Sequence, residues 1–152
     1  ASIAGDKKGE KIQGDKAFVE FAKSIKLDLN TQSVYLLNFW ASWCSPCLRE
    51  LPGLNRFETI YKDKGVKILS VNGDYEDQEK VIRKTIKDFG LSFKIYPDNK
   101  NKIISSFKIT GLPVTMIFKG TKLVDKILGE VDFDSSSFHK KIDQLLKYDG
   151  EN

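Results

Sequence analysis

Both cysteines of the chain lie between an apolar run and a segment with helical periodicity. Residues 34–40 are almost continuously apolar and are bounded by turn residues, which is typical of a strand buried on both sheet faces. After the cysteines, apolar residues recur at helical spacing: Leu48, Leu51, Leu54, Phe57 and Tyr61. The sequence therefore predicts a Cys-x-x-Cys pair, Cys44 and Cys47, at a strand-to-helix turn.

The rest of the chain predicts an α/β fold. Residues 66–71 form a second apolar run, and residues 81–89 carry an apolar helical stripe that Gly90 closes. This alternation favours parallel strands with helices on both faces. Residues 114–118 and 123–128 predict an antiparallel hairpin, and the segment after Asp134 a last helix, so the expected sheet is mixed.

The start of the chain differs in composition. Residues 1–14 are polar and rich in Gly and Lys, which predicts a flexible leader. Apolar residues then follow at spacings of three and four and predict a helix that begins near Asp15: Phe18, Phe21, Ala22, Ile25 and Leu29. We expect a single domain over residues 15–149, since 152 residues suffice for one hydrophobic core.

Net charge and the length of the apolar runs exclude several classes of protein. The net charge of +4 comes from lysines scattered among acids, so we expect no nucleic-acid partner. No apolar run approaches the roughly 18 residues of a membrane span. The chain begins without Met or a signal segment, which predicts a processed or trimmed form.

The helix start explains why this pair can be reactive. Unpaired backbone N–H groups and the positive end of the helix dipole favour a thiolate at Cys44, and such settings lower a cysteine pKa from about 8.5 to roughly 3.5–7.5. Cys47 lies one turn further on, so it can attack a mixed disulfide formed by Cys44. Pro46 suits a first-turn position because it has no N–H to pair. We expect Cys44 as the nucleophile and Cys47 as the resolving thiol.

Two other interpretations of the pair are weaker. A structural disulfide closing so short a ring would remove only roughly 2 kcal/mol of denatured-state entropy. A zinc site would need a second pair of ligands, and His139 is the only histidine. We therefore expect no metal and no cofactor besides a redox-active Cys44–Cys47 disulfide.

Pro113 opens the β-rich run at 114–118, where a proline lacks the donor that a central strand needs. Because cis bonds make up only about 5% of X–Pro bonds, the residues alone favour an ordinary trans proline.

The stretch Asn38–Cys47, the Glu50-x-Pro52 that follows, and Leu112-Pro113 ahead of a hairpin closely resemble the TlpA/ResA/CcmG-like thioredoxins. The resemblance implies a thioredoxin fold and an exported or membrane-tethered thiol-disulfide oxidoreductase that keeps cysteines of other proteins reduced. It implies that Pro113 is a cis proline beside the active site.

By the same resemblance, Leu112 would offer backbone groups to an extended substrate, and Trp43 would flank the disulfide. Its implied substrates are protein disulfides or thiols, often those of apocytochrome c or of copper-site assembly proteins. It also implies an upstream thiol donor, expected to be membrane-bound. We expect a monomer in an extracytoplasmic compartment.

The chain departs from the family pattern at the position of the buried acid. Asn38 stands where ordinary thioredoxins carry that acid, so another residue is needed to assist proton transfer to Cys47. Asp74 and Glu76 are the nearest candidates after the next strand, although helix capping or solvation is the more common role of such acids. The helix predicted at the start also replaces the family's usual β-hairpin.

Four alternatives remain open. A general cytoplasmic thioredoxin would share the cysteine pair. A copper-delivery module would use both thiolates with Met116 or His139, although Met116 suits core filling in a strand. A peroxidase would need a differently supported cysteine, and a binding scaffold with an inert disulfide would show an unreactive Cys44.

Overall fold

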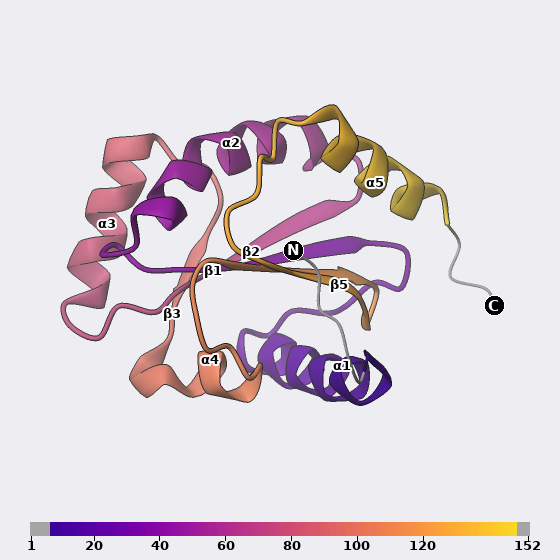
Figure 1. Cartoon of the computed structure of the whole chain (residues 1–152), viewed down its shortest axis with the longest axis horizontal. Helices are drawn as coiled ribbons and strands as arrows, with labels where there is room; N and C mark the ends of the chain where they lie inside the picture. The colour runs from indigo at the N-terminus through magenta and orange to yellow at the C-terminus, as the bar shows by residue number, and fades with distance from the viewer. Residues whose placement is uncertain (1–6, 149–152) are drawn as a thin grey trace.

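The computed structural model describes residues 7–148 and shows one five-stranded sheet (Figure 1). In the order β3-β2-β1-β4-β5, the strands are Ile95–Pro97, Val66–Asn72, Val34–Trp40, Val114–Lys119 and Lys122–Leu128. The pairs β1–β2 and β2–β3 are parallel, whereas β1–β4 and β4–β5 are antiparallel. The predicted mixed sheet and its two buried central strands are confirmed.

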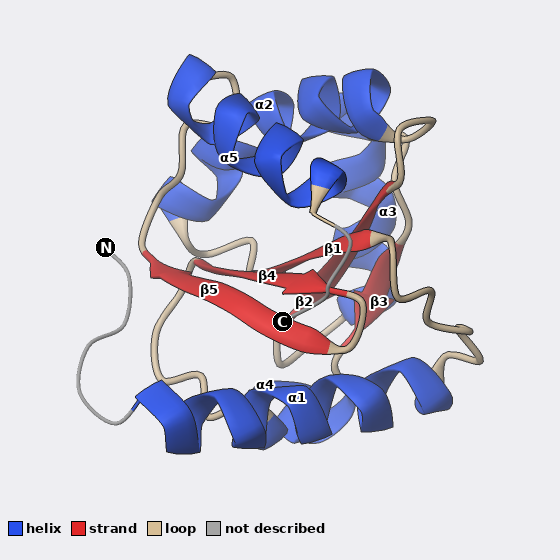
Figure 2. Cartoon of the chain, turned by 90° about the vertical axis from the view of Figure 1, so that its right-hand side faces the viewer, coloured by secondary structure: helices blue, strands red, loops and turns tan. Residues whose placement is uncertain are grey.

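Helices cover both faces of this sheet (Figure 2). On one face lie α2 (Ser45–Tyr61), α3 (Gln78–Phe89) and α5 (Ser136–Lys147). On the other lie α1 (Lys7–Ser24) and α4 (Lys102–Ser106), the latter after the 3-10 turn Asn99–Asn101. All seven residues of β1 are buried, because it is the middle strand and has helices above and below it.

The helix α1 corrects the predicted start of the fold. It begins at Lys7 instead of near Asp15, so a flexible leader is wrong for residues 7–14, and residues 1–6 lie outside the described part. The first turns of α1 have few apolar side chains, and contacts with Leu123 on β5 hold the helix in place at Gly14 and Asp15. A Cβ at Gly14 would lie 3.0 Å from Leu123, and the Leu123 N–H donates to Asp15 at 2.7 Å.

The same helix also ends earlier than its apolar stripe predicts. It stops at Ser24, and Lys26 adopts a left-handed φ of 57° that no helix continues through. Ile25 and Leu29 still pack against the core of this face, but they do so from the connecting loop. The residues of the predicted apolar stripe are thus packed on the core as expected, but the last of them lie in a loop and not in a helix.

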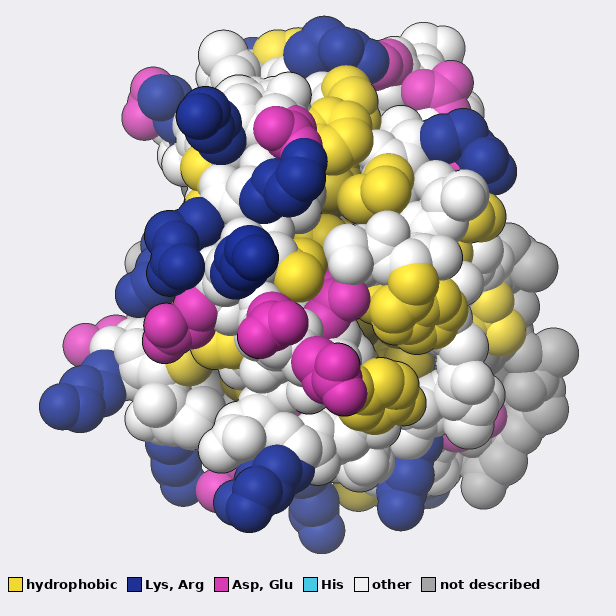
Figure 3. Space-filling model, turned by 90° about the vertical axis from the view of Figure 1, so that its left-hand side faces the viewer, with side chains coloured by type: hydrophobic (Ala, Val, Ile, Leu, Met, Phe, Trp, Pro, Cys, Tyr) yellow, Lys and Arg dark blue, Asp and Glu magenta, His cyan; other side chains and the backbone are white. Residues whose placement is uncertain are grey.

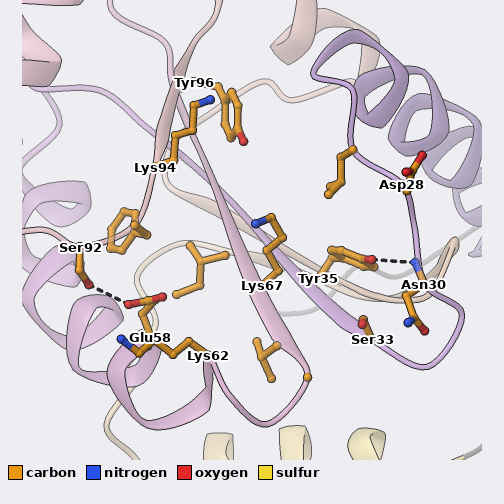
Figure 4. A pocket seen from close by; sticks show the side chains of 15 residues that line it. Asp28, Asn30, Ser33, Tyr35, Glu58, Lys62, Lys67, Ser92, Lys94 and Tyr96 are labelled. Carbon is orange, nitrogen blue, oxygen red and sulfur yellow. Dashed lines mark hydrogen bonds between the residues drawn. The ribbon is translucent and has the colours of Figure 1, made fainter.

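One edge of the sheet is only partly covered. The strand β3 pairs with β2 over residues 70–72, and no other described strand pairs with this edge at residues 66–69. A groove of about 600 Å³ lies there, with Lys67 and Lys94 among the residues that line it (Figure 4). Lysines at an open edge discourage pairing with another chain.

Candidate active site

The cysteine pair lies where the chain passes from β1 into α2. Cys44 is the N-cap of α2, with extended backbone angles of φ −100° and ψ 103°. Its Sγ accepts a hydrogen bond from the Cys47 N–H at 3.3 Å, and the two cysteines form a disulfide. Cys44 retains 6% exposure and Cys47 none. Of the two cysteines, only Cys44 therefore has surface that another molecule can reach.

The Leu112–Pro113 peptide bond is cis, which confirms what the family resemblance implied and not what base rates favoured. Register explains its position. Phe39 in β1 pairs with Val114 in β4, so Pro113 lies level with the end of β1, where the turn to the cysteines begins. Pro113 is buried and Leu112 partly so.

Two aromatic side chains stand exposed beside this turn. Trp43 is 63% exposed and Tyr75, from the loop after β2, is 77% exposed. Together with Leu112 they border a cavity of about 140 Å³. The end of the molecule where β1 leads into α2 faces the viewer in Figure 3, and hydrophobic side chains form a strip across it. Such a patch on a soluble domain is typical of a contact surface for another protein.

The buried acid of the site is Glu50, one turn after Cys47 on α2. Its side chain is almost fully buried, at 3% exposure. Its Oε1 accepts a hydrogen bond from Asn38 Nδ2 at 3.1 Å, and its Oε2 accepts one from the Val131 N–H at 2.7 Å. Burial raises the pKa of Glu50 from 4.5 to about 7, partly offset by these two hydrogen bonds, and nearby Glu130 raises it further.

Asn38 on β1 is fully buried, and among the described residues only one end of its side-chain amide has hydrogen-bond partners. Its Nδ2 reaches Glu50 and, at 3.4 Å, Thr115 Oγ1 on β4. Its Oδ1 has no hydrogen-bond partner within residues 7–148. A buried acceptor without a donor costs about 1–3 kcal/mol, so the unpaired Asn38 Oδ1 lowers the stability of the folded chain.

Asp74 and Glu76, the two acids expected to assist proton transfer, have different surroundings in the structure. The Asp74 carboxylate accepts hydrogen bonds from the Ser42 N–H at 2.9 Å, the Ser42 hydroxyl at 2.7 Å and Asn72 Nδ2 at 2.7 Å. It thereby fastens the turn before Cys44 to the end of β2. Glu76 is exposed.

Sequence reasoning missed Glu50 as the candidate acid. A usable signal was present, because Glu50 follows Cys47 by three residues and so faces the same way on the helix. It is a charged residue within an otherwise apolar, inward-facing stripe of α2. The family resemblance pointed instead to an acid after the second strand.

Residues 7–148 offer neither a metal centre nor a membrane span. They contain no cluster of three or more His, Cys, Asp or Glu side chains that would hold a metal ion. None of their helices combines the length and the apolar character that crossing a bilayer requires.

Comparison with known proteins agrees with the fold. Residues 11–127 match the AhpC/TSA family. The thiol-disulfide oxidoreductase ResA of a Bacillus cereus strain is 38% identical over 110 residues, which is 71% of this chain and 62% of that protein. ResA of Bacillus anthracis is 37% identical over the same shares. The chain thus spans less than two thirds of the length of these relatives.

Solved structures show the same architecture. A putative thioredoxin from Neisseria meningitidis superposes with a TM-score of 0.69 at 26% identity, covering 79% of each chain. A putative thiol:disulfide interchange protein DsbE from Chlorobium tepidum gives 0.67 at 27% identity, covering 76% of this chain and 82% of that one. The thioredoxin fold and the resemblance to the TlpA/ResA/CcmG-like group are confirmed, and by the match over residues 11–127 the chain belongs to the AhpC/TSA family.

Proposed function

We propose that the protein is a thiol-disulfide oxidoreductase that reduces disulfides in partner proteins. The observation that carries this proposal is the asymmetry of the pair. Cys44, at the helix N-terminus directly after Trp43, keeps 6% exposure, while Cys47 is fully buried one turn further along α2. The names of the ResA relatives support the same activity.

The reaction begins with the reduced dithiol. The Cys44 thiolate attacks one sulfur of a substrate disulfide, forms a mixed disulfide and releases the other substrate sulfur as a thiolate, which takes up a proton. The Cys47 thiolate then attacks Cys44 Sγ, forms the Cys44–Cys47 disulfide and releases the second substrate thiol. Two electrons pass from the enzyme dithiol to the substrate disulfide. An upstream dithiol returns the enzyme to its reduced form by the same steps in reverse.

Glu50 serves as the proton acceptor for Cys47 in this scheme. The buried Cys47 must lose its proton before it can attack, and Glu50 lies one helical turn away on the same face of α2. A pKa of about 7 leaves roughly half of the Glu50 carboxyl groups free to accept a proton at neutral pH. An ordinary exposed glutamate would be a weaker base.

The exposed strip beside Cys44 is the proposed substrate surface. Trp43 and Tyr75 present apolar area to a partner, and Leu112 would offer backbone groups to an extended segment that carries the disulfide. This geometry favours protein substrates over small thiols, because a small disulfide would use only the sulfur of Cys44.

We further infer, from the family resemblance, where the reaction takes place. The protein acts as a reductant outside the cytoplasm and receives electrons from a membrane-bound thiol donor. Its substrates are protein disulfides such as those of apocytochrome c or of copper-site assembly proteins. It works as a monomer, with the Cys44–Cys47 pair as its redox group and without a metal.

The trapping experiment tests the order of the two cysteines. A Cys47→Ser variant should accumulate mixed disulfides with a model protein substrate, released by dithiothreitol and seen as a higher-mass band on non-reducing gels. The matched controls are Cys44→Ser and the double variant, neither of which should trap. Trapping by Cys44→Ser, or reduction of the model substrate at the wild-type rate by that variant, would refute the proposal.

A further inference from the structure

Two ion pairs bridge α2 and the loop of residues 129–135. Arg49 pairs with Glu130, with Nη2–Oε1 at 2.8 Å and Nε–Oε1 at 3.1 Å. Arg56 pairs with Asp134, with Nη2–Oδ2 at 2.7 Å and Nε–Oδ1 at 3.1 Å. Both pairs line one cleft of about 440 Å³. The two ion pairs are alike in chemistry, but the one at Arg49 lies closer along α2 to the two cysteines than the one at Arg56.

Only one of these ion pairs brackets the buried acid. Arg49 directly precedes Glu50 on α2, and Glu130 directly precedes Val131, whose N–H donates to Glu50 at 2.7 Å. The Arg49–Glu130 ion pair therefore runs beside the Val131–Glu50 hydrogen bond, because each of its residues is the chain neighbour of one partner in that bond. Arg56 lies almost two turns further along α2, and its side chain donates to Asp134.

The pair contributes little to global stability but affects local charge. The side chains of Arg49 and Glu130 are 60% and 41% exposed, and exposed ion pairs stabilise proteins by only about 0–1 kcal/mol. A carboxylate near another carboxylate makes the second harder to ionise, and a cation does the opposite. Glu130 raises the pKa of Glu50, and Arg49 places a positive charge directly against the Glu130 carboxylate.

Other charged groups around the cleft are Arg56 on α2, and Asp132 and Asp134 on the loop. The side chain that donates to Glu50, Asn38 on β1, is uncharged, and so is Thr115 on β4, which Asn38 also contacts. None of the cleft residues lines the cavity beside Trp43. The cleft is thus separate from the cavity that Trp43, Tyr75 and Leu112 border.

We propose that Arg49 and Glu130 are positioning residues that set the proton affinity of Glu50 from the solvent cleft, on the side that the substrate does not cover. The ion pair holds the Val131 N–H on the carboxylate and balances one negative charge against one positive charge beside it. Glu50 exchanges its proton with water through this cleft while a partner remains bound at Cys44. This inference rests on the proposed role of Glu50 in the reaction.

The test measures the titration of Glu50 directly. The side-chain carboxyl of Glu50, labelled with carbon-13, is followed by NMR from pH 4 to pH 9 in the oxidised protein. Glu130→Gln removes a negative charge and should lower the pKa of Glu50. Arg49→Gln leaves Glu130 unscreened and should raise it. Each shift should correspond to roughly a three- to tenfold change in proton affinity.

Opposite signs separate electrostatic tuning from simple loosening of the loop. If the pair only held the loop, both substitutions would weaken the Val131 hydrogen bond and shift the pKa upward together. Arg49→Lys keeps the positive charge and should remain close to wild type. The matched controls Arg56→Gln and Asp134→Asn should shift the pKa much less than their Arg49 and Glu130 counterparts.

Shifts of the same sign, no shift, or equal shifts in the controls would overturn the proposal. Because the titration is measured in the oxidised protein, it does not depend on the reaction. The role of Glu50 is tested separately by the rate at which Glu50→Gln resolves mixed disulfides. Normal resolution by that variant would refute the proposed function of Glu50, even if the pKa shifts appear as expected.

Discussion

Replacing Glu50 with Gln should stabilise the protein at alkaline pH relative to acid pH. Glu50 has a pKa of about 7 in the folded chain against 4.5 ordinarily, chiefly because it is buried. Below pH 4.5 the Glu50 carboxyl is protonated in both the folded and the unfolded chain, so it does not lower the free energy of unfolding. As pH rises from 4.5 to 7 it ionises in the unfolded chain first, so folding loses stability.

The magnitude follows from the pKa difference. A shift from 4.5 to about 7 is worth about 3 kcal/mol in total, at roughly 1.36 kcal/mol per unit. About 2 to 3 kcal/mol of that falls between pH 5 and pH 8. For a chain of this size the same amount corresponds to roughly 5 to 12 °C in Tm. Gln keeps the shape and one acceptor for the Val131 N–H but never ionises.

The assay is urea unfolding of oxidised wild type and Glu50→Gln at pH 5 and pH 8. The variant should gain about 2 to 3 kcal/mol relative to wild type between the two pH values, because all other ionisable groups are common to both. Glu79→Gln, whose side chain is 87% exposed, is the matched control and should show no such gain. An equal difference between variant and wild type at both pH values would refute a buried carboxyl with a raised pKa.

Three further outcomes are expected. Asp74→Ala should lower the free energy of unfolding by about 1–3 kcal/mol in urea at pH 7, because it removes the acceptor for the turn before Cys44, whereas Glu76→Ala should change it little. Gly111→Val should slow reduction of a protein disulfide but not of a small one, with unchanged urea stability, because its Cβ meets nothing within 4 Å and fills the cavity mouth. Replacing Lys67 and Lys94 together by Val should raise the apparent mass in sedimentation at high concentration, since both line the open edge of β2; an unchanged monomer would contradict that edge argument.

The cysteine site could be predicted because it depends on local chemistry. A buried strand, a turn and a helix start follow each other within a few residues, and each has a pattern that periodicity reveals. The exposure of Cys44 and the burial of Cys47 then follow from their places in the first turn of α2. The β4–β5 hairpin could be predicted for the same reason, because two β-rich runs and the turn between them follow each other directly in the chain.

Contacts between distant segments could not be predicted. The Val131 N–H that holds Glu50 comes from 81 residues further along the chain, and no local pattern announces that approach. The first turns of α1 form where Asp15 and Gly14 meet β5, again through a distant contact. The cis bond before Pro113 could be predicted only from the family resemblance, because the residues around a proline do not show whether its peptide bond is cis or trans.

Glu50 and Asn38 together explain why the site tolerates unfavourable polar groups. Ionised, Glu50 costs about 3 kcal/mol, and the unpaired Asn38 Oδ1 costs about 1–3 kcal/mol more. A proton on Glu50 removes the first cost. The site is therefore most stable when Glu50 already holds a proton, and the less stable ionised state is the one that can take a proton from Cys47.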